Sequence, residues 1–564
     1  MASTFGGIEI SKRALFAQQT ALSTTGHNIA NANTAGYSRQ VVNLVASRPM
    51  EAVGMMRSNV PGQLGQGVEF DHVKRVREQF LDTQYYNENK EYGNWTVRND
   101  VLGKLEAITN EPSDTGIRQV IENFWNAWQV FSKEPENTTA RAALKESSLA
   151  MTETFNHTAS QLDDLTNDLS ENVRSKVSET NTILDQVARL NNEIFRVEGL
   201  GNDANDLRDQ RDLLVDNLSK IINVSVERAE GGYNVKMGNV ELVHGINVVT
   251  SFAATPVPAA DGTIPSADGL TFDAAYKNGD LQSGEVFGMI ESRDKYVASY
   301  KFQLDSMVVA IAKGNVKVTL PAGSVLPPQL PEGTIIGSTT YTGTETLTDQ
   351  ERMLKTDTEI TVKGLNGLHM LGYSLEEPTQ SGIPFFTLQK GASEFTASSI
   401  TLNPAIIENI SKITASSRVM TDVNGNIVKD SNGNETVVRG NNSIALITAG
   451  IRNLRFDFDP KKNDSQSTLS GVPILASGTF DEFFRAIVGQ LGVQTQEATR
   501  QSDNQKVLVD QVDSRRQSVS GVATDEEMAN MIKYQHAYNA AARILTTFDE
   551  MLDKVINGMG TVGR

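Results

Sequence analysis

Large apolar side chains recur at every seventh position near the start of the chain. The positions are Ile8, Leu15, Leu22 and Ile29. A seven-residue repeat keeps its members along one narrow side of a helix, as in the seam of a coiled coil. The pattern therefore predicts a helix over 7–31 whose apolar seam needs a partner.

This predicted helix runs into a stretch of residues that favour turns, NIANANTAGYSRQ at 28–40. Asparagine adopts left-handed backbone more readily than most residues and competes for backbone hydrogen bonds, so it favours helix ends. The turn residues are Asn28, Asn31, Asn33, Gly36 and Tyr37. We expect Gly36 to adopt a positive φ, which glycine tolerates best, and the chain to change direction here before an extended run.

The C-terminal segment carries a longer apolar stripe. Its members are spaced alternately three and four residues apart: Met531, Tyr534, Tyr538, Ala541, Leu545, Phe548, Leu552, Val555 and Met559. Thr524 and Glu527 have the spacing of a capping box, and Gly558 can end the helix. A single amphipathic helix is marginal in water. The N-terminal seam is therefore predicted to be its partner.

Helical and β-like segments alternate between the two ends. The spacing of apolar residues predicts helices within 95–225, 284–313 and 478–519. Period-two alternation and Asn-Gly turn signals predict β structure in 229–281 and 385–465. The sequence therefore predicts a mainly α protein with β-rich outer domains, folded as an elongated multidomain hairpin.

Four domains are predicted from this order of elements. The terminal helices, in 1–40 and 521–564, would pair as a coiled-coil domain. A long helical-bundle rod would comprise 41–228, 282–315 and 466–520, and inserted β modules would comprise 229–281 with 364–465. Residues 316–363 are rich in Thr and Pro and are predicted to form an extra exposed insertion.

Composition excludes several classes of function. The chain has 564 residues, a formal net charge of −18 and no cysteine. The acidic balance disfavours a nucleic-acid partner, and the lack of cysteine excludes disulfides and thiolate chemistry. No apolar run approaches the ~18 residues of a membrane span, and residues 1–30 do not have the pattern of a secretory signal peptide. Export, if it occurs, would need another route.

No pattern in the chain predicts catalysis, a cofactor or a metal site. The six histidines lack the HExxH spacing, and surface or helix-capping positions are predicted for them. The acidic clusters at 163–168 and 206–212 are predicted to be solvated helix faces rather than paired catalytic carboxylates. Turns are predicted at 62–67, in place of a phosphate loop, and at 422–426, in place of a calcium loop.

Several segments resemble a known family. ALSTTGHNIANANTAGYSRQ (21–40) closely resembles the N-terminal signature of the flagellar rod, hook and hook-associated protein family. NDLRDQRDLLVDNLSKI (205–221), GNNSIAL (440–446) and the segment 518–556 resemble stretches typical of its hook–filament junction members. A family pattern is kept by Asn366, His369, Gly372 and Tyr373, but it lies farther from the preceding helix than in similar proteins. This departure supports an insertion at 316–363.

The resemblance implies a structural, non-enzymatic, extracellular protein of the bacterial flagellum, needed for flagellum assembly and motility. Such proteins pass unfolded through the flagellar channel without a cleaved signal peptide, and assemble as a ring at the hook tip that joins hook to filament. The implied partners are further copies of the chain, the hook protein, hook-associated protein 3, the flagellar export apparatus and a cytosolic chaperone on the C-terminal helix. Both seams are then expected to form the assembly interface lining the tube.

Three alternatives remain open from the sequence. A hook or distal-rod protein would share the N-terminal signature but not the segments 205–221 and 518–556. A coiled-coil surface adhesin would explain the helices and β modules but not apolar seams at both termini. An enzyme carried on the flagellum, with 316–363 as its catalytic domain, would need catalytic residues there, and this segment has no His or Trp and no recognisable pair of acids.

Overall fold

The computed structural model describes residues 5–48, 65–109, 116–229, 232–254, 269–422 and 426–558. Two compact units are present. The first comprises Met1–Val97, Asn172–Gly288 and Gln501–Arg564, and the second comprises Arg98–Glu171 and Met289–Arg500. Met559, residues 62–64 of the predicted turn at 62–67 and residues 423–425 of the predicted turn at 422–426 lie outside the described residues.

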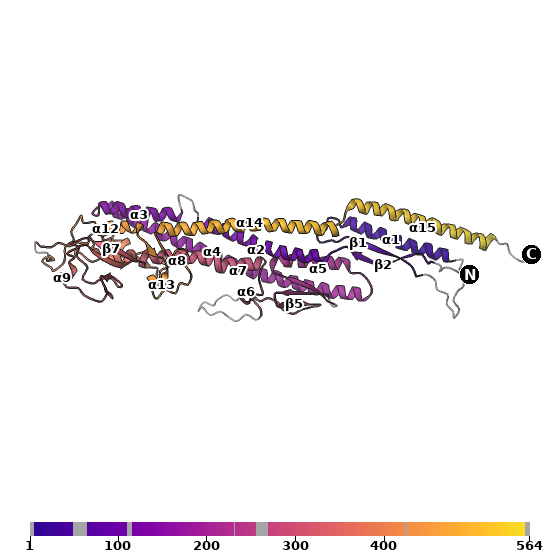
Figure 1. Cartoon of the computed structure of the whole chain (residues 1–564), viewed down its shortest axis with the longest axis horizontal. Helices are drawn as coiled ribbons and strands as arrows, with labels where there is room; N and C mark the ends of the chain where they lie inside the picture. The colour runs from indigo at the N-terminus through magenta and orange to yellow at the C-terminus, as the bar shows by residue number, and fades with distance from the viewer. Residues whose placement is uncertain are drawn as a thin grey trace, which may run out of the picture. The chain divides into compact units, whose positions relative to one another are not determined.

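Helices are the main elements of both units (Figure 1). In chain order they are α1 (Gly6–Ala30), α2 (Gln79–Thr109), α3 (Ile117–Lys133), α4 (Thr138–Gly199), α5 (Asn205–Ile221), α6 (Phe272–Asn278), α7 (Glu285–Glu291), η1 (Ser292–Val297), α8 (Ala298–Lys313), α9 (Asp349–Arg352), α10 (Gly364–Met370), α11 (Pro404–Glu408), η2 (Ile410–Lys412), α12 (Ser443–Gly450), η3 (Ile451–Asn453), α13 (Pro460–Asn463), α14 (Phe480–Ser520) and α15 (Thr524–Gly558). The helices predicted within 95–225, 284–313 and 478–519 are confirmed.

The strands form small antiparallel sheets. They are β1 (Gln40–Ala46), β2 (Val68–Arg75), β3 (Ser225–Ala229), β4 (Gly232–Met237), β5 (Val240–His244), β6 (Asn247–Val248), β7 (Asn315–Leu320), β8 (Ile335–Ile336), β9 (Thr339–Thr340), β10 (Thr358–Lys363), β11 (Phe386–Leu388), β12 (Ile400–Leu402), β13 (Phe456–Asp457) and β14 (Ser477–Gly478). The predicted mainly α fold with β modules and paired terminal helices is confirmed.

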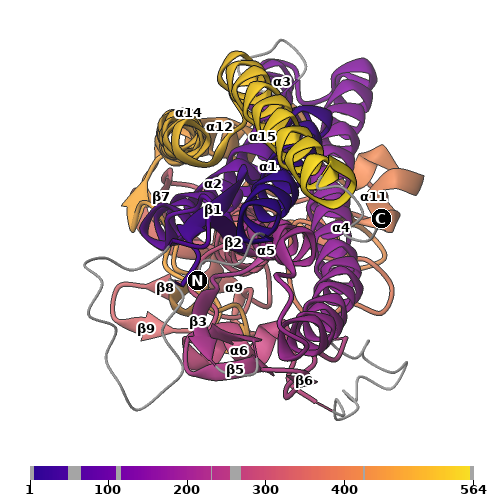
Figure 2. The same cartoon turned by 90° about the vertical axis from the view of Figure 1, so that its right-hand side faces the viewer.

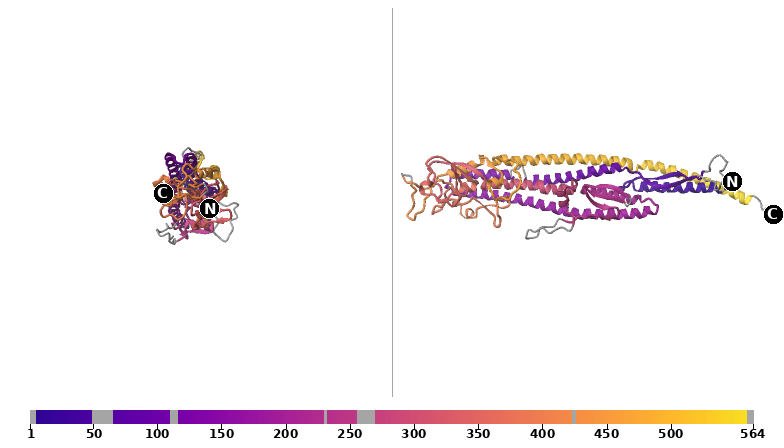
Figure 3. Two further views of the ribbon diagram at one scale, coloured as in Figure 1. Left: turned by 90° about the vertical axis from the view of Figure 1, so that its left-hand side faces the viewer. Right: turned by 60° about the horizontal axis from the view of Figure 1, so that its bottom comes forward.

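In the first unit, α1 packs against α15 on one side and against the ribbon of β1 and β2 on the other (Figures 1 and 2). The right-hand view of Figure 3 shows the same pairing of the two terminal helices. β1 and β2 are antiparallel, with Gln40 opposite Arg75. The N-terminal and C-terminal helices of the chain thus pack directly against each other.

The first unit also contains a four-stranded meander in the order β3-β4-β5-β6. The sequence YNVKMGNVELV turns at Gly238, which has φ +56°, so that the buried Val235 and Met237 of β4 pair with β5. Asn191 of α4 fixes the meander, because its amide donates to the carbonyl oxygens of Tyr233 and Gly245 at 3.0 and 2.6 Å.

The second unit is built around aromatic side chains of α3. The amphipathic sequence of this helix buries Phe124, Trp125 and Trp128. Their rings lie 5.3 to 6.4 Å, between centroids, from Phe385, Phe386 and Phe480. Since buried aromatic side chains contribute large apolar areas, this cluster holds α3, β11 and α14 together.

The segment 316–363 differs from the separate exposed insertion predicted from its composition. Its two ends pair as β7 and β10, which are adjacent strands of a sheet in the order β7-β10-β8-β9, with β7 at its edge. Arg352 is buried, and its guanidinium donates to both carboxylate oxygens of Glu435, at 2.6 and 2.7 Å, and to the Tyr373 hydroxyl at 3.0 Å. The segment therefore shares its core with 364–465, because a buried guanidinium needs its carboxylate partner.

His369 differs from the surface or capping position predicted for the histidines, because it is fully buried. Its Nδ1 lies 2.6 Å from the carbonyl oxygen of Ile383, and its Nε2 accepts the backbone N–H of Thr414 at 3.0 Å. A carbonyl only accepts, so the proton is on Nδ1 and the ring is neutral. Burial lowers the pKa of His369 from its usual 6.5 to about 4.

We predict that His369 makes the second unit sensitive to mild acid. A histidine whose pKa is depressed by folding stabilises the folded state above its unfolded pKa, and this stability is lost as the pH falls from 6.5 to about 4. The loss should reach about 3 kcal/mol. Urea unfolding of the full chain between pH 7 and pH 4 measures it. His369→Gln should remove most of this pH dependence, whereas the exposed His157→Gln should retain it; equal slopes in the two variants would contradict the prediction.

Candidate functional site

The buried face of α1 is made of small residues. Its buried side chains are Ser11, Ala17, Ala21, Thr25 and Asn28, whereas the predicted seam residues Ile8, Leu15, Leu22 and Ile29 are half-buried. Gly7 lies against the ring of Phe548, and a Cβ at this position would overlap that ring. Small side chains on α1 therefore allow the bulky side chains of α15 to approach closely.

The predicted stripe of α15 faces α1. Ala541 is buried, and half-buried positions are held by Met531, Tyr534, Tyr538, Leu545, Phe548 and Leu552. Val555, near the end of the helix, is half exposed. A second set of apolar side chains lies beside this stripe and is exposed, among them Ile544 and Met551, which are 50% and 56% exposed. Val555 continues this second stripe, because residues 7 and 11 positions after Ile544 lie on the same face.

Asn28, near the end of α1, forms hydrogen bonds with both the start of β1 and the first turn of α15. Its side chain is 1% exposed. The amide nitrogen donates to the carbonyl oxygen of Gln40 at 2.8 Å and to the Glu527 carboxylate at 3.0 Å. The amide oxygen accepts the backbone N–H of Gln40 at 3.0 Å and the Tyr37 hydroxyl at 2.8 Å. One buried amide thus fixes the start of β1 and the first turn of α15 against α1.

The other predicted turn residues shape the backbone around Asn28. The amide of Asn31 donates to the carbonyl oxygen of His27 at 3.1 Å, and Asn33 is exposed. Gly36 has φ +78°, the positive φ expected from the sequence, and a Cβ there would lie 3.1 Å from Leu213. Burial and nearby carboxylates raise the pKa of Tyr37, so its hydroxyl remains a donor.

Glu527 has a different role from the predicted one. The sequence places it in a capping box with Thr524, but its carboxylate is 4% exposed and receives the amide of Asn28. Nearby, the backbone N–H of Arg39 donates to the carbonyl oxygen of Ser520 at 2.8 Å, and its guanidinium donates to Glu526 at 3.1 Å. The segment that connects α14 to α15 is therefore hydrogen-bonded to the turn after α1.

The prediction of a solvated acidic face at 206–212 holds for Asp206, which is exposed, and is wrong for Asp209 and Asp212. Asp209, Asp212 and Asp216 occupy one face of α5, and all three are buried. Because they are three and four residues apart, their side chains lie on the same side of the helix. They meet arginines from distant parts of the chain, and we call this group the buried ion network. It comprises Asp82, Asp209, Asp212 and Asp216 with Arg75, Arg77, Arg211 and Arg516.

The buried ion network has close contacts. Arg75 donates to Asp209 at 2.5 Å and to Asp212 at 3.0 Å. Arg516 donates to both carboxylate oxygens of Asp216, at 3.0 and 2.8 Å. Burial alone would raise the pKa of Asp212, but Arg77, Arg75 and Arg211 outweigh it and hold that pKa below its usual range. These guanidinium groups therefore stabilise Asp212 in its charged form.

The other acidic cluster, at 163–168, behaves as predicted. Asp164 and Asp168 are exposed on α4, and Asp163 is half-exposed beside Lys301. Across the described ranges, no three acidic or histidine side chains are grouped as a metal site would require. Among the described residues, no helix is long and apolar enough to span a membrane.

Family models match three parts of the chain. "Flagellar hook-associated protein FlgK helical domain" matches residues 102–315. "Flagella basal body rod protein" matches 8–37, and "Flagellar basal body rod FlgEFG protein C-terminal" matches 514–558. The terminal matches cover most of α1 and α15.

Curated relatives match along the whole chain. Flagellar hook-associated protein 1 of Bacillus subtilis (strain 168) is 31% identical over 572 residues, covering 100% of both chains. The protein of the same name from Salmonella typhimurium is 26% identical over 570 residues, covering 96% of this chain and 98% of the relative. A solved structure, the flagellar hook junction protein FlgK from Burkholderia pseudomallei, matches with a TM-score of 0.49 and 14% identity, covering 78% of this chain and 100% of that one.

We predict that the two acidic clusters differ in their effect on stability. Asp212→Asn removes a charge that Arg75 and Arg77 need, and should lower the free energy of unfolding by about 3–5 kcal/mol. Asp168→Asn, on an exposed face, should change it by less than about 0.5 kcal/mol. Urea denaturation followed by circular dichroism measures both. Equal effects would show that the buried ion network does not depend on the charge of Asp212.

We predict a strong coupling between Asn28 and Glu527. Asn28→Asp removes the amide donor and places two carboxylates at hydrogen-bond distance, at a cost of about 3 kcal/mol. Adding Glu527→Gln should recover part of this loss, because the new amide can donate to the aspartate. A double-mutant cycle of unfolding free energies measures the coupling. Additive effects of the two substitutions would mean that the contact contributes nothing.

Proposed function

Because this chain belongs to the flagellar hook-associated protein 1 family, it is a structural component of the bacterial flagellum, and we propose that it assembles as a ring at the hook tip, where hook and filament meet. The observation that carries this proposal is the second apolar stripe of α15. It remains exposed although α1 already covers the first stripe. Exposed apolar patches of this kind mark interaction surfaces.

We propose that both apolar sets act in assembly, in different ways. The seam residues predicted from the sequence, such as Tyr538 and Phe548, hold α1 and α15 together as one unit. Ile544, Met551 and Val555 then face the neighbouring copies. Burying a large apolar side chain contributes about 1.5–3 kcal/mol, so a ring that repeats these contacts gains stability from each copy.

The same helix supports the proposals for export and partners. We propose that the chain travels through the flagellar channel without a cleaved signal peptide and is extracellular once assembled. A cytosolic chaperone would cover the apolar face of α15 before export, when α1 does not. The hook protein and hook-associated protein 3 are the proposed neighbours on either side of the ring. The relatives are named as flagellar hook-associated proteins, and we infer that this chain is not an enzyme.

We predict that the two faces of α15 can be separated by substitution. Ile544→Asp with Met551→Asp places charges on the exposed stripe, and should abolish filament attachment while the purified chain keeps its melting temperature. Leu545→Asp with Phe548→Asp places charges against α1, and should also loosen the helix pair, by several kcal/mol. Electron microscopy of cells that make each variant, together with calorimetry of the purified chains, measures the two effects.

A matched control adds a charge elsewhere on α15. Thr546 is exposed and lies on neither apolar stripe, so Thr546→Asp should leave both attachment and melting unchanged. Normal filaments on cells that make Ile544→Asp with Met551→Asp would exclude the exposed stripe as an assembly surface. Loss of filaments with Thr546→Asp would show that any added charge on α15 prevents assembly.

A further inference from the structure

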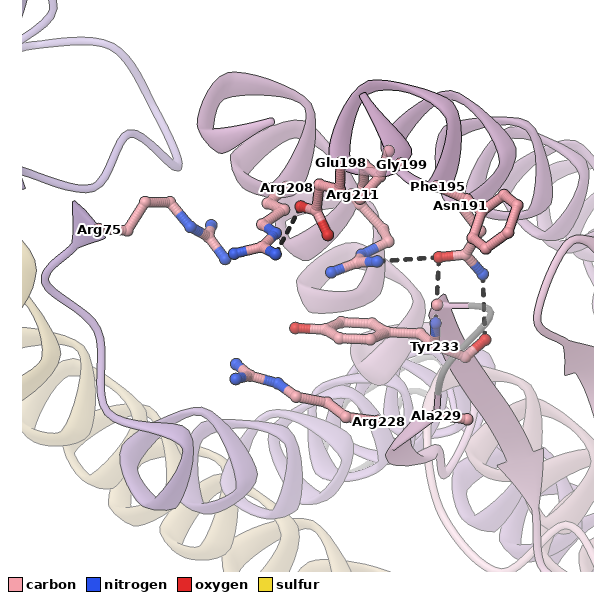
Figure 4. Close-up of a pocket in the computed structure, with 12 residues that line it drawn as sticks. Arg75, Asn191, Phe195, Glu198, Gly199, Arg208, Arg211, Arg228, Ala229 and Tyr233 are labelled. Atoms are coloured by element: carbon pink, nitrogen blue, oxygen red, sulfur yellow. Dashed lines mark hydrogen bonds and ion pairs between the residues drawn. The ribbon is translucent and has the colours of Figure 1, made fainter. Parts of the chain in front are cut away.

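The first unit contains a pocket lined by arginines. It lies where the end of α4, the start of α5 and the strands β3 and β4 meet, and its volume is about 340 Å³ (Figure 4). The charged and aromatic side chains around it are Arg75, Phe195, Glu198, Arg208, Arg211, Arg228 and Tyr233. Arg75 and Arg211 also belong to the buried ion network, so the pocket opens onto one side of that network.

Arg211 lacks a close negative partner. Its side chain is 5% exposed, and its Nη1 donates to the neutral amide oxygen of Asn191 at 2.9 Å. The nearest carboxylate contact, to Asp212, is 3.9 Å long, and the Nε has no acceptor among the described residues. Its guanidinium lies 3.4 Å from the centre of the Tyr233 ring. Burial lowers the pKa of Arg211 despite these neighbours, so its positive charge is incompletely compensated.

The remaining arginines surround the same space. Arg228 is exposed, lies 5.9 Å from the centre of the Tyr233 ring, and forms no ion pair with the described residues. Arg208 pairs with Glu198 at 2.5 Å, and Arg75 is already paired with Asp209 and Asp212. Figure 4 shows these guanidinium groups directed toward the space around the Tyr233 hydroxyl. Cations thus outnumber the lining carboxylate.

We propose that this pocket binds a small multivalent oxyanion, a phosphate or a polycarboxylate such as citrate. Planar guanidinium groups bind carboxylate and phosphate oxygens through paired hydrogen bonds. Arg211 is the buried anchor, and Arg228 and Arg208 contact the anion from the open side. Glu198 competes with the anion for Arg208. The site involves the first unit alone and does not depend on ring assembly.

Isothermal titration of the full chain with inorganic phosphate and, separately, with citrate tests the proposal at constant ionic strength, with chloride as the balancing ion. We expect saturable binding of at least one of them, and the preferred anion identifies phosphate or carboxylate as the ligand chemistry. Arg228→Gln should weaken binding about tenfold, because it removes charged hydrogen-bond donors. Glu198→Gln should tighten it, because the competing carboxylate is removed.

The controls separate this pocket from general attraction of anions to arginine. Arg439 is an exposed arginine of the second unit, and Arg439→Gln should bind as the unsubstituted chain does. Arg228 and Glu198 are both accessible to solvent, so their substitution should leave the melting temperature unchanged. The proposal is overturned if neither anion shows saturable binding, or if either Arg228→Gln or Glu198→Gln retains the original affinity.

Discussion

Buried charges have to be paired, and in the first unit this requirement determines which segments meet. Asp212 has no exposed surface, and its charge is held by Arg75 at the end of β2 and by Arg77 just after it. Arg516 brings α14 to the same place through Asp216. A slip of any of these elements would leave a charge without its partner, at a cost of several kcal/mol. The buried ion network therefore sets the register of α5 against β2 and α14.

The terminal helices depend on this arrangement. Ser38 donates its backbone N–H to Asp209 of the buried ion network at 2.9 Å, so the turn after α1 is held by α5. Ser520, four residues after Arg516, accepts the N–H of Arg39. Between these anchors, Asn28 joins α1 to α15. The direction of α15 within the first unit, and hence the direction of its exposed apolar stripe, follows from the polar contacts of its first turn.

The sequence predicts what local spacing determines. The stripe of α15, the end of α1 and the positive φ of Gly36 all depend on residues close to one another in the chain. The burial of Asp212 depends instead on a distant residue, because Arg75 is 137 positions away. The spacing of the aspartates shows that they share one face of a helix, but it does not show which residues cover that face. The sequence does contain a useful signal: three aspartates at helical spacing in 209–216, and two arginines close together at 75 and 77. Arg352 and His369 were missed for the same reason, since Glu435 and Thr414 lie 83 and 45 positions away.

The bond between Asn28 and Glu527 also constrains the order of events during synthesis. Its two residues are 499 positions apart, so α1 leaves the ribosome long before its partner helix exists. Closing so long a loop is slow, and contacts of this kind form late in folding. The nascent chain therefore carries an uncompleted first unit until its last residues are made. On the export route proposed above, a chain engaged before α15 has paired with α1 would not have to be unfolded at its two ends.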